Sequence, residues 1–194
     1  MTDWADYYRK AWAKRTEIFD TLMKQEQSLP RVLGQFDWWE RHNQLRMNND
    51  TGEMFYTEVP FRPAPVQNFT PFIFDHVGDH DVVVEYGCGY GKRLLELSLA
   101  GCSVPMLGLD VSPEGIALGK KLANLDDGAN VGFIEAGWNY RPRGNPLIFT
   151  FYTAMYQDPF PEDWFDQPGA IIMIEPSETI ERLGKRPNVI TIGV

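Results

Sequence analysis

Residues 82–92 constrain the fold of this chain more than any other feature, and their sequence is VVVEYGCGYGK. The run of β-branched residues at the start predicts a strand that is buried on both faces. Gly87, Gly89 and Gly91 predict a tight turn, because glycine adopts positive φ without strain and lets a ligand approach the backbone. Residues 92–100 carry leucines at helical spacing and are followed by glycine, so they predict a helix. The feature is a strand, a glycine loop and a helix start whose free N–H groups can face a ligand.

The sequence after this loop alternates between short apolar runs and helical patterns. Further strands are predicted at residues 106–109, 131–134, 147–151, 170–174 and 189–192, and further helices at residues 113–124 and 178–183. Ser112 is the expected N-cap of the first of these two helices, with Pro113 at its first position. This alternation predicts βαβ units and a Rossmann-like, doubly wound, mostly parallel sheet.

The first part of the chain has a different pattern. Residues 3–27 predict a helix with one apolar face, which we expect Pro30 to end, and residues 32–46 predict a weaker helix. Residues 48–52 form a turn cluster, and residues 53–74 mix prolines with aromatics and predict a long irregular segment.

We therefore expect two parts within one compact domain. Residues 1–78 are predicted to be a helical and aromatic extension that packs over the pocket, and residues 79–194 to be an α/β core. Two interpretations of the aromatics in the extension stay open, a lid over the pocket and ordinary packing on the core, of which packing is favoured. The aromatics concerned are Tyr56, Phe61, Phe69 and Phe72.

The composition excludes several classes of protein. The 194 residues carry a formal net charge of −9, which does not attract phosphate backbones, so nucleic acid is not the expected partner. No apolar run has the length of a membrane span, and the first residues lack the apolar segment of a signal peptide. Two cysteines imply no disulfide framework. His and Asp side chains can bind metals, and they gather at His76, Asp79, His80 and Asp81. A turn is the simpler explanation of this group, so no metal site is predicted. We expect a cytoplasmic protein without a membrane partner.

Asp110 stands nineteen residues after Gly91, at the end of the second predicted strand. An acid at this place can accept hydrogen bonds from both hydroxyls of a ribose. The dinucleotide fingerprint G-x-G-x-x-G would need glycine where Lys92 stands, so that fingerprint is not matched. Glu85 precedes the loop and is badly placed for a pyrophosphate, whereas a cofactor with a cationic amino group suits it.

These residues resemble the first motif of the class I S-adenosylmethionine (SAM)-dependent methyltransferases, [D/E]-x-G-x-G-x-G, position by position. Residues 108–112 resemble the second motif of that family, and residues 168–176 resemble its fifth strand. The resemblance implies SAM as cofactor and S-adenosylhomocysteine as product. It implies that the glycine loop wraps the methionine part, that Glu85 holds the amino group, that Asp110 binds the ribose and that Val111 lies on the adenine.

The family often has an acid after the third strand that contacts the adenine, and here this acid is out of register. Glu135 could take that role, or Trp138 could stack on the adenine. After the fourth strand, where the family places residues that face the substrate, this chain has Tyr152. The residues that the resemblance assigns to the cofactor are Glu85, Tyr86, Gly87, Cys88, Gly89, Gly91, Asp110, Val111, Glu135, Ala136, Trp138 and Tyr152.

The catalytic residues are not defined by the sequence. If the acceptor needs a general base, the candidates are Tyr152, Asp158 and Tyr56. Acids cluster between the fourth and fifth strands at positions 158, 162, 163 and 166. At the mouth of the crevice they would attract an amine or another cationic acceptor, while the simpler alternative is a solvated acidic loop.

The sheet of that family usually ends in two more strands with an antiparallel insertion, whereas here only one such strand, at residues 189–192, is predicted. The edge of the predicted sheet is either open or covered by a second subunit in a homodimer. The predicted function is methyl transfer from SAM to a small-molecule acceptor. The alternatives are a protein that binds SAM or S-adenosylhomocysteine without catalysis and, less favoured, a nucleotide-dependent oxidoreductase.

Overall fold

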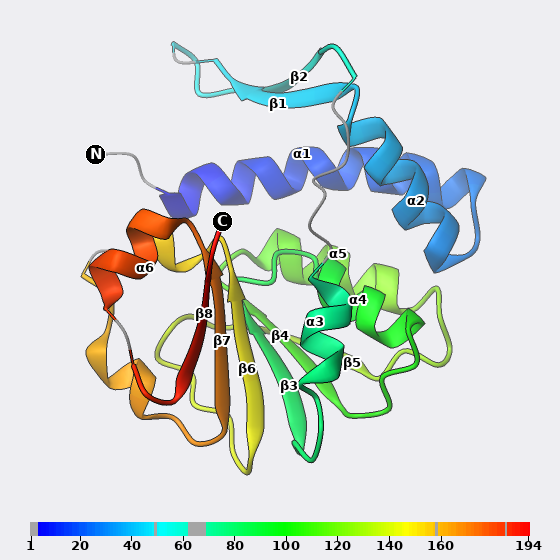
Figure 1. Ribbon diagram of the computed structural model, residues 1–194. Helices are drawn as coiled ribbons and strands as arrows, with labels where there is room; N and C mark the ends of the chain where they lie inside the picture. Colours follow the sequence, from blue (N-terminus) through cyan, green and yellow to red (C-terminus); the bar gives the residue numbers. More distant parts are fainter. Residues whose placement is uncertain (1–3, 49, 62–68, 158, 185) are drawn as a thin grey trace.

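A six-stranded, fully parallel sheet forms the centre of the computed structural model, which describes residues 4–48, 50–61, 69–157, 159–184 and 186–194 (Figure 1). The strand order is β5-β4-β3-β6-β7-β8. This is the doubly wound order, in which the chain starts at a central strand, moves to one edge and then returns to build the other half. The predicted Rossmann-like α/β fold is confirmed. The strands are β3 (Val82–Tyr86), β4 (Met106–Asp110), β5 (Val131–Glu135), β6 (Pro146–Phe151), β7 (Ala170–Glu175) and β8 (Val189–Gly193).

Every strand predicted for the core is present, because each is a short apolar run in a sheet that is buried on both faces. Val83 and Phe149 pack on one face of the sheet, and Val84 and Ile148 pack on the other. Among the described residues no antiparallel strand joins this sheet, and β8 is its last strand. No helix in the described ranges has both the length and the apolar character needed to cross a membrane.

The helices of the core follow the predicted pattern. They are α4 (Lys92–Leu99), α5 (Pro113–Ala123) and α6 (Ser177–Leu183). Ser112 caps α5 as expected, since its Oγ accepts a hydrogen bond of 3.2 Å from the N–H of Gly115. Between β6 and β7 the described residues form two short 3-10 segments, η1 (Ala154–Tyr156) and η2 (Glu162–Asp166).

The N-terminal part starts with two helices, α1 (Trp4–Gln25) and α2 (Leu29–Glu40). The expectation that Pro30 ends the first helix is wrong. The first helix ends at Gln25, and Pro30 stands in the first turn of α2, where the missing N–H of proline costs no hydrogen bond.

A β-hairpin follows where the sequence predicted the end of a helix and an irregular segment. Its strands are β1 (Asn43–Met47) and β2 (Met54–Glu58), and they pair antiparallel around the predicted turn cluster. Residues 32–46 are therefore helical only as far as Glu40. Residues 53–74 contain β2 and the short helix α3 (Thr70–Asp75) among their described positions. Asn48 stabilises the turn, because its Oδ1 accepts the N–H of Asp50 at 2.9 Å.

The N-terminal helices share a hydrophobic core with the α/β part. Phe19 and Phe36 from α1 and α2 are fully buried, and they pack in one cluster with Tyr90, Leu95 and Leu118. In Figure 1, α1 crosses above the carboxyl ends of the strands, and the hairpin lies on the far side of α1 from the sheet. Of the described part of residues 1–78, α1 thus lies over the edge of the sheet at which the glycine loop lies, whereas α3 packs on a face of the sheet.

Candidate functional site

The strand order reverses between β3 and β6, which run side by side in the middle of the sheet. In open parallel sheets the ligand crevice lies at this point, outside the carboxyl ends of the two strands. Gly87 directly follows β3, and Tyr152 directly follows β6. The structure therefore brings the glycine loop and the segment after the fourth core strand to the same place.

All three glycines of the loop have positive φ, at 67° for Gly87, 58° for Gly89 and 72° for Gly91. Each also lies against a side chain from another element. A Cβ atom on Gly87 would lie 2.1 Å from Thr153 Cγ2, and one on Gly89 would lie 2.3 Å from Trp12 Cζ2. A Cβ on Gly91 would lie 2.4 Å from Phe133 Cε1. Glycine is thus required at these positions both by backbone conformation and by close packing within the protein.

Asp110 joins the glycine loop to the start of α5. Its Oδ2 accepts the N–H of Gly89 and its Oδ1 accepts the N–H of Ser112, both at 2.8 Å. Burial raises the pKa of Asp110, and these backbone N–H groups oppose that shift. Each carboxylate oxygen has a second lone pair, so the group can accept further hydrogen bonds from a ligand.

Glu85 is a buried carboxyl group with an unpaired oxygen beside the glycine loop. Its side chain is 2% exposed, its Oε1 lies 3.9 Å from Arg93 Nη1, and its Oε2 has no hydrogen-bond partner. Burial raises the pKa of Glu85 to about 8, although Arg93 acts in the opposite direction. A buried polar atom without a partner is costly. A cationic ligand group at this place would remove that cost.

Three further predicted residues lie next to Asp110. Val111 is 57% exposed, and Glu135 is the partner of Asp110 in the β4–β5 register. The N–H of Ala136 donates to the carbonyl oxygen of Asp110 at 2.9 Å. The tips of β4 and β5 therefore present one exposed apolar and one exposed acidic side chain beside the buried carboxylate.

Two predicted aromatic residues pack with each other. The ring of Tyr86 points into the core, and its hydroxyl donates to the carbonyl oxygen of Tyr140 at 2.6 Å. Trp138 stacks on that ring with centroids 5.5 Å apart, and it also makes an edge contact with Trp164. One face of the Trp138 indole is thus occupied by Tyr86, which limits the predicted stacking on adenine to the other face. Tyr86 can contribute only its backbone to a ligand.

The side chain of Cys88 also packs inside the protein. The thiol is buried, its Sγ lies 3.5 Å from the carbonyl oxygen of Gly89, and burial raises its pKa well above the ordinary value. A buried thiol with a raised pKa is a poor nucleophile.

The segment after β6 is held in an unusual conformation. Tyr152 has a φ of 51°, a positive value that among the described residues is otherwise found only in glycines, and its side chain is 39% exposed. The N–H groups of Thr153 and Ala154 donate to Oε1 of Glu175 at 3.0 Å each. Backbone strain of this kind persists only where surrounding contacts hold it.

Glu175 is a residue of the site that the sequence analysis did not assign. It ends β7, is fully buried, and its Oε2 has no well-formed hydrogen bond, with the Thr150 hydroxyl close by. Burial raises the pKa of Glu175, and the hydrogen bonds from the segment after β6 oppose that shift. An acid directly after a buried apolar strand was the available signal, since Glu85 and Asp110 stand at the tips of their strands in the same way.

Several predicted residues are not part of this arrangement. Tyr56 lies in the hairpin, where its ring contacts Trp39 with centroids 4.3 Å apart, so it is not at the crevice. Burial raises the pKa of Tyr56 to about 12. The prediction of Tyr56 as a general base is therefore wrong, because α1 lies between the hairpin and the strand ends (Figure 1). Asp158 lies outside the described residues.

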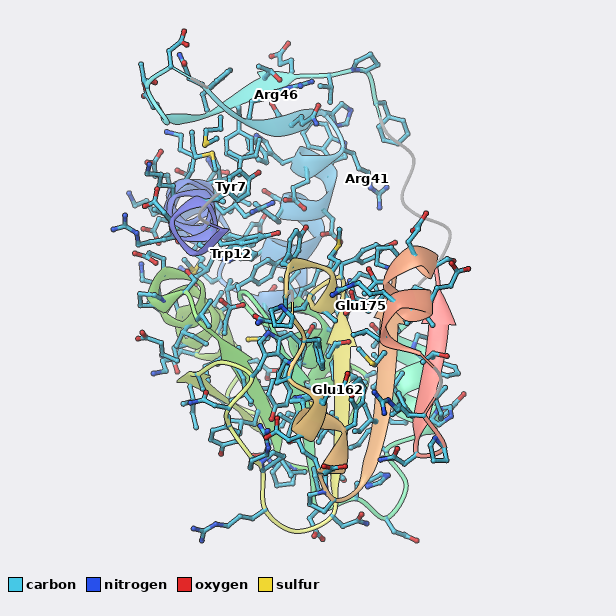
Figure 2. All side chains as sticks on the ribbon, turned by 90° about the vertical axis from the view of Figure 1, so that its left-hand side faces the viewer. Tyr7, Trp12, Arg41, Arg46, Glu162 and Glu175 are labelled. Atoms are coloured by element: carbon cyan, nitrogen blue, oxygen red, sulfur yellow. The ribbon has the colours of Figure 1, made fainter. Side chains whose placement is uncertain are left out.

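Two of the acids after β6 are paired with arginines away from the mouth. Glu162 pairs with Arg186, and Asp163 pairs with Arg141 at 2.7 Å. Arg186 precedes β8, so this part of the connection lies at the amino edge of the sheet. Figure 2 accordingly shows Glu162 below Glu175, which lies at the carboxyl edge. Of the two interpretations, the solvated acidic loop describes these two residues, whose side chains are 73% and 74% exposed, and the acidic mouth does not.

The remaining polar and hollow features lie elsewhere. Asp81 accepts the N–H of Asn145 at 2.8 Å near the start of β3, as part of a turn. Within the described ranges no three His, Cys, Asp or Glu side chains gather in a way that could hold a metal ion. A hollow of about 440 Å³ between α3 and α4 contains no predicted site residue. Its lining consists of Thr70, Pro71, Phe74, Asp75, Glu96 and Ala100.

Comparison with known proteins gives partial structural likenesses. No protein-family model matches the chain, and no curated protein matches it in sequence. One similar solved structure is a geranyl diphosphate C-methyltransferase from Streptomyces coelicolor with Mg2+, geranyl diphosphate and S-adenosyl-L-homocysteine. It is 21% identical, covers 46% of this chain and 35% of its own, and has a TM-score of 0.40.

Two further structures are described in the same terms. A plantazolicin methyltransferase in complex with a substrate analogue and S-adenosylhomocysteine is 20% identical over 51% of this chain and 38% of its own, with a TM-score of 0.41. A SAM-dependent methyltransferase from Aquifex aeolicus is 20% identical over 50% of this chain and 54% of its own, with a TM-score of 0.41. The chain thus spans between 35% and 54% of the length of these structures. Such likenesses are too weak to assign a residue or an acceptor to this chain.

Proposed function

We propose that this chain binds SAM at the carboxyl ends of β3 and β4 and transfers its methyl group to a small-molecule acceptor. The observation that carries the proposal is the buried Glu85 carboxyl group, whose Oε2 has no partner and which stands next to a glycine loop. The amino group of SAM is a cation that would supply the missing partner. The sheet topology supports the same place, because the crevice lies where the strand order reverses.

The residues around the loop have complementary roles in this proposal. Glu85 binds the amino group, and Asp110 accepts the ribose hydroxyls with the lone pairs that Gly89 and Ser112 leave free. Val111 offers its exposed side chain to the adenine, with Glu135 and Ala136 beside it and Trp138 two residues further along the chain. The loop residues Tyr86, Gly87, Cys88, Gly89 and Gly91 contribute backbone. When bound, SAM supplies an electrophilic methyl group, and S-adenosylhomocysteine is the product.

The acceptor side of the proposed site is the segment after β6, with Tyr152 as the residue that faces the substrate. Tyr8 of α1 contacts Tyr156 of η1 with ring centroids 5.2 Å apart, so α1 lies against this segment. A site covered by a helix favours a small acceptor over a macromolecule. The amine or cationic character expected from the acids after β6 loses the support of Glu162 and Asp163, because both are paired elsewhere.

In this site the chain would act mainly by positioning the two reactants and excluding water. The buried state of Glu85, Asp110 and Glu175 gives the crevice a low-dielectric floor. If the acceptor must lose a proton, Tyr152 is the remaining candidate base among the described residues first considered for that role.

A second function is favoured by one specific observation. Thr153 and Trp12 fill the space above Gly87 and Gly89, so the loop is closely packed without a ligand. A protein that binds SAM or S-adenosylhomocysteine without methyl transfer, as a sensor or partner subunit, needs only the nucleoside side of the site. A nucleotide-dependent oxidoreductase is less favoured, because the unpaired Glu85 would face a pyrophosphate.

Titration calorimetry with SAM, S-adenosylhomocysteine and NAD tests the proposal. We expect saturable binding of SAM and S-adenosylhomocysteine by the wild type, and a lower affinity for both in Glu85→Gln and Asp110→Ala. Asp127→Asn, an exposed acid in the loop after α5, is the matched control and should bind like the wild type. Binding of NAD with no response to SAM would exclude the proposed function. Turnover on a panel of small acceptors then separates a transferase from a binding protein.

A further inference from the structure

One side chain of the N-terminal extension lies directly on the glycine loop. The indole of Trp12 fills the place of a Cβ on Gly89, and its Cδ1 would lie 3.3 Å from a Cβ on Gly115 in the first turn of α5. Gly89 and α5 are also the two elements that Asp110 joins through its hydrogen bonds. Figure 2 looks along α1 and shows Trp12 on the side of the helix that faces the sheet, whereas Tyr7 lies on the opposite side.

Trp12 is itself held by neighbours on both parts of the molecule. The guanidinium of Arg15 lies 4.7 Å from the centroid of the indole, and Tyr90 makes an edge contact with centroids 5.6 Å apart. Tyr90 belongs to the glycine loop, yet its ring is buried against Phe19 and Phe36 of the two N-terminal helices. The loop is therefore clamped to α1 at two successive positions, by Trp12 on Gly89 and by Tyr90 in the helical core.

The packing of α1 indicates that this helix is a fixed support for the glycine loop and not a movable lid. Phe19 and Ala11 of α1 are fully buried, and Phe19 stacks on Phe36 with centroids 4.0 Å apart. A helix with that much buried surface is not a loose cover. The glycine loop, by contrast, consists of residues with wide conformational freedom, so its geometry depends on the side chains that lie against it.

We infer that Trp12 is a positioning residue for cofactor binding, acting through Gly89. By filling the space between the loop and α5, it keeps the N–H of Gly89 on Asp110 and presents the loop ready for SAM. This inference rests on the proposed function. A loop that must be ordered when the ligand binds lowers affinity, whereas a preorganised loop does not.

The test uses Trp12→Ala and Trp12→Phe in the full chain. We expect Trp12→Ala to weaken SAM binding by about tenfold, the effect of having to order the loop on binding, and Trp12→Phe to recover part of the loss. Leu22→Ala is the matched control, because Leu22 is buried in the same cluster on α1, almost three turns from Trp12. It should lower the melting temperature while leaving the dissociation constant of SAM within about twofold of the wild type.

Amide hydrogen exchange without any ligand gives a second readout. The N–H of Gly89 should exchange faster in Trp12→Ala than in the wild type, since this substitution frees the loop. In Leu22→Ala its exchange rate should equal that of the wild type. Wild-type affinity in Trp12→Ala, or an equal loss of affinity in Leu22→Ala, would overturn the inference. If wild-type protein does not bind SAM at all, the proposed function fails instead, while the exchange result still reports whether Trp12 positions the loop.

Discussion

At the scale of single residues, Glu85 makes a prediction about pH. Burial raises its pKa from the ordinary 4.5 to about 8, so the folded protein holds a proton that the unfolded chain releases. The stability that this proton contributes is therefore present in full below pH 4.5 and is lost as the pH rises through about 8. We expect the melting temperature to fall across this range, and to fall less in Glu85→Gln, which has no proton to lose. Equal pH profiles for the two proteins would contradict the assignment.

Gly89 gives a second residue-scale prediction. Gly89→Ala imposes a positive φ on alanine and places its Cβ on Trp12, so we expect a loss of at least about 2 kcal/mol of unfolding free energy. Gly101→Ala is the control, because Gly101 also has positive φ but has open space around it. Urea denaturation should show a smaller loss there. The double substitution of Gly89→Ala with Trp12→Ala should lose less than the sum of the two single changes, since it removes the clash.

At the scale of elements, Glu175 of β7 accepts two backbone hydrogen bonds from the segment after β6. Glu175→Ala leaves the N–H groups of Thr153 and Ala154 without their acceptor, and it should cost about 2–4 kcal/mol in urea denaturation. Glu175→Gln keeps an acceptor oxygen and should cost clearly less. Amide exchange at these two positions should accelerate in the alanine variant. Glu178→Gln in α6, an exposed acid, is the control, and an equal loss there would show that Glu175 has no special role.

The same scale shows which elements a sequence can predict. The core strands were predictable because a strand buried on both faces is a continuous apolar run, as in residues 82–84 and 170–174. The hairpin was missed because each of its strands is only five residues long and neither shows the regular polar–apolar alternation that marks a half-buried strand. The role of Pro30 was predicted wrongly because proline occurs both just after the end of a helix and in the first turn of the next one.

The candidate site was predictable only in part, for a related reason. The glycine loop and Asp110 are local in sequence, so their spacing predicts that they meet. Trp12 reaches Gly89 from a distant part of the chain, and no local pattern signals such a contact. The sequence left two interpretations of the acids after β6 open, and Glu162 lies away from the mouth because the connection descends along the sheet before β7 begins, as its pairing with Arg186 shows.

At the scale of the whole molecule, the predicted boundary at residue 78 can be tested with a fragment of the chain. If the α/β part were independent of the extension, residues 79–194 would fold alone. The buried cluster argues against this, because Tyr90, Leu95, Leu118 and Leu122 of the α/β part are covered by Phe19, Phe36 and their neighbours in α1 and α2. Removing the helices would expose a contiguous apolar surface at the base of the glycine loop.

We therefore expect the fragment 79–194 to lack cooperative unfolding, to bind a hydrophobic dye and to have no ordered near-ultraviolet signal from its aromatic residues, as a collapsed state without fixed packing does. Adding residues 1–40 as a separate peptide should restore part of that signal, because α1 and α2 carry the missing half of the cluster. A fragment that unfolds cooperatively on its own would show that the extension is an appendage. The glycine loop would then owe its shape to the sheet, and the clamp on Tyr90 and Gly89 would be dispensable.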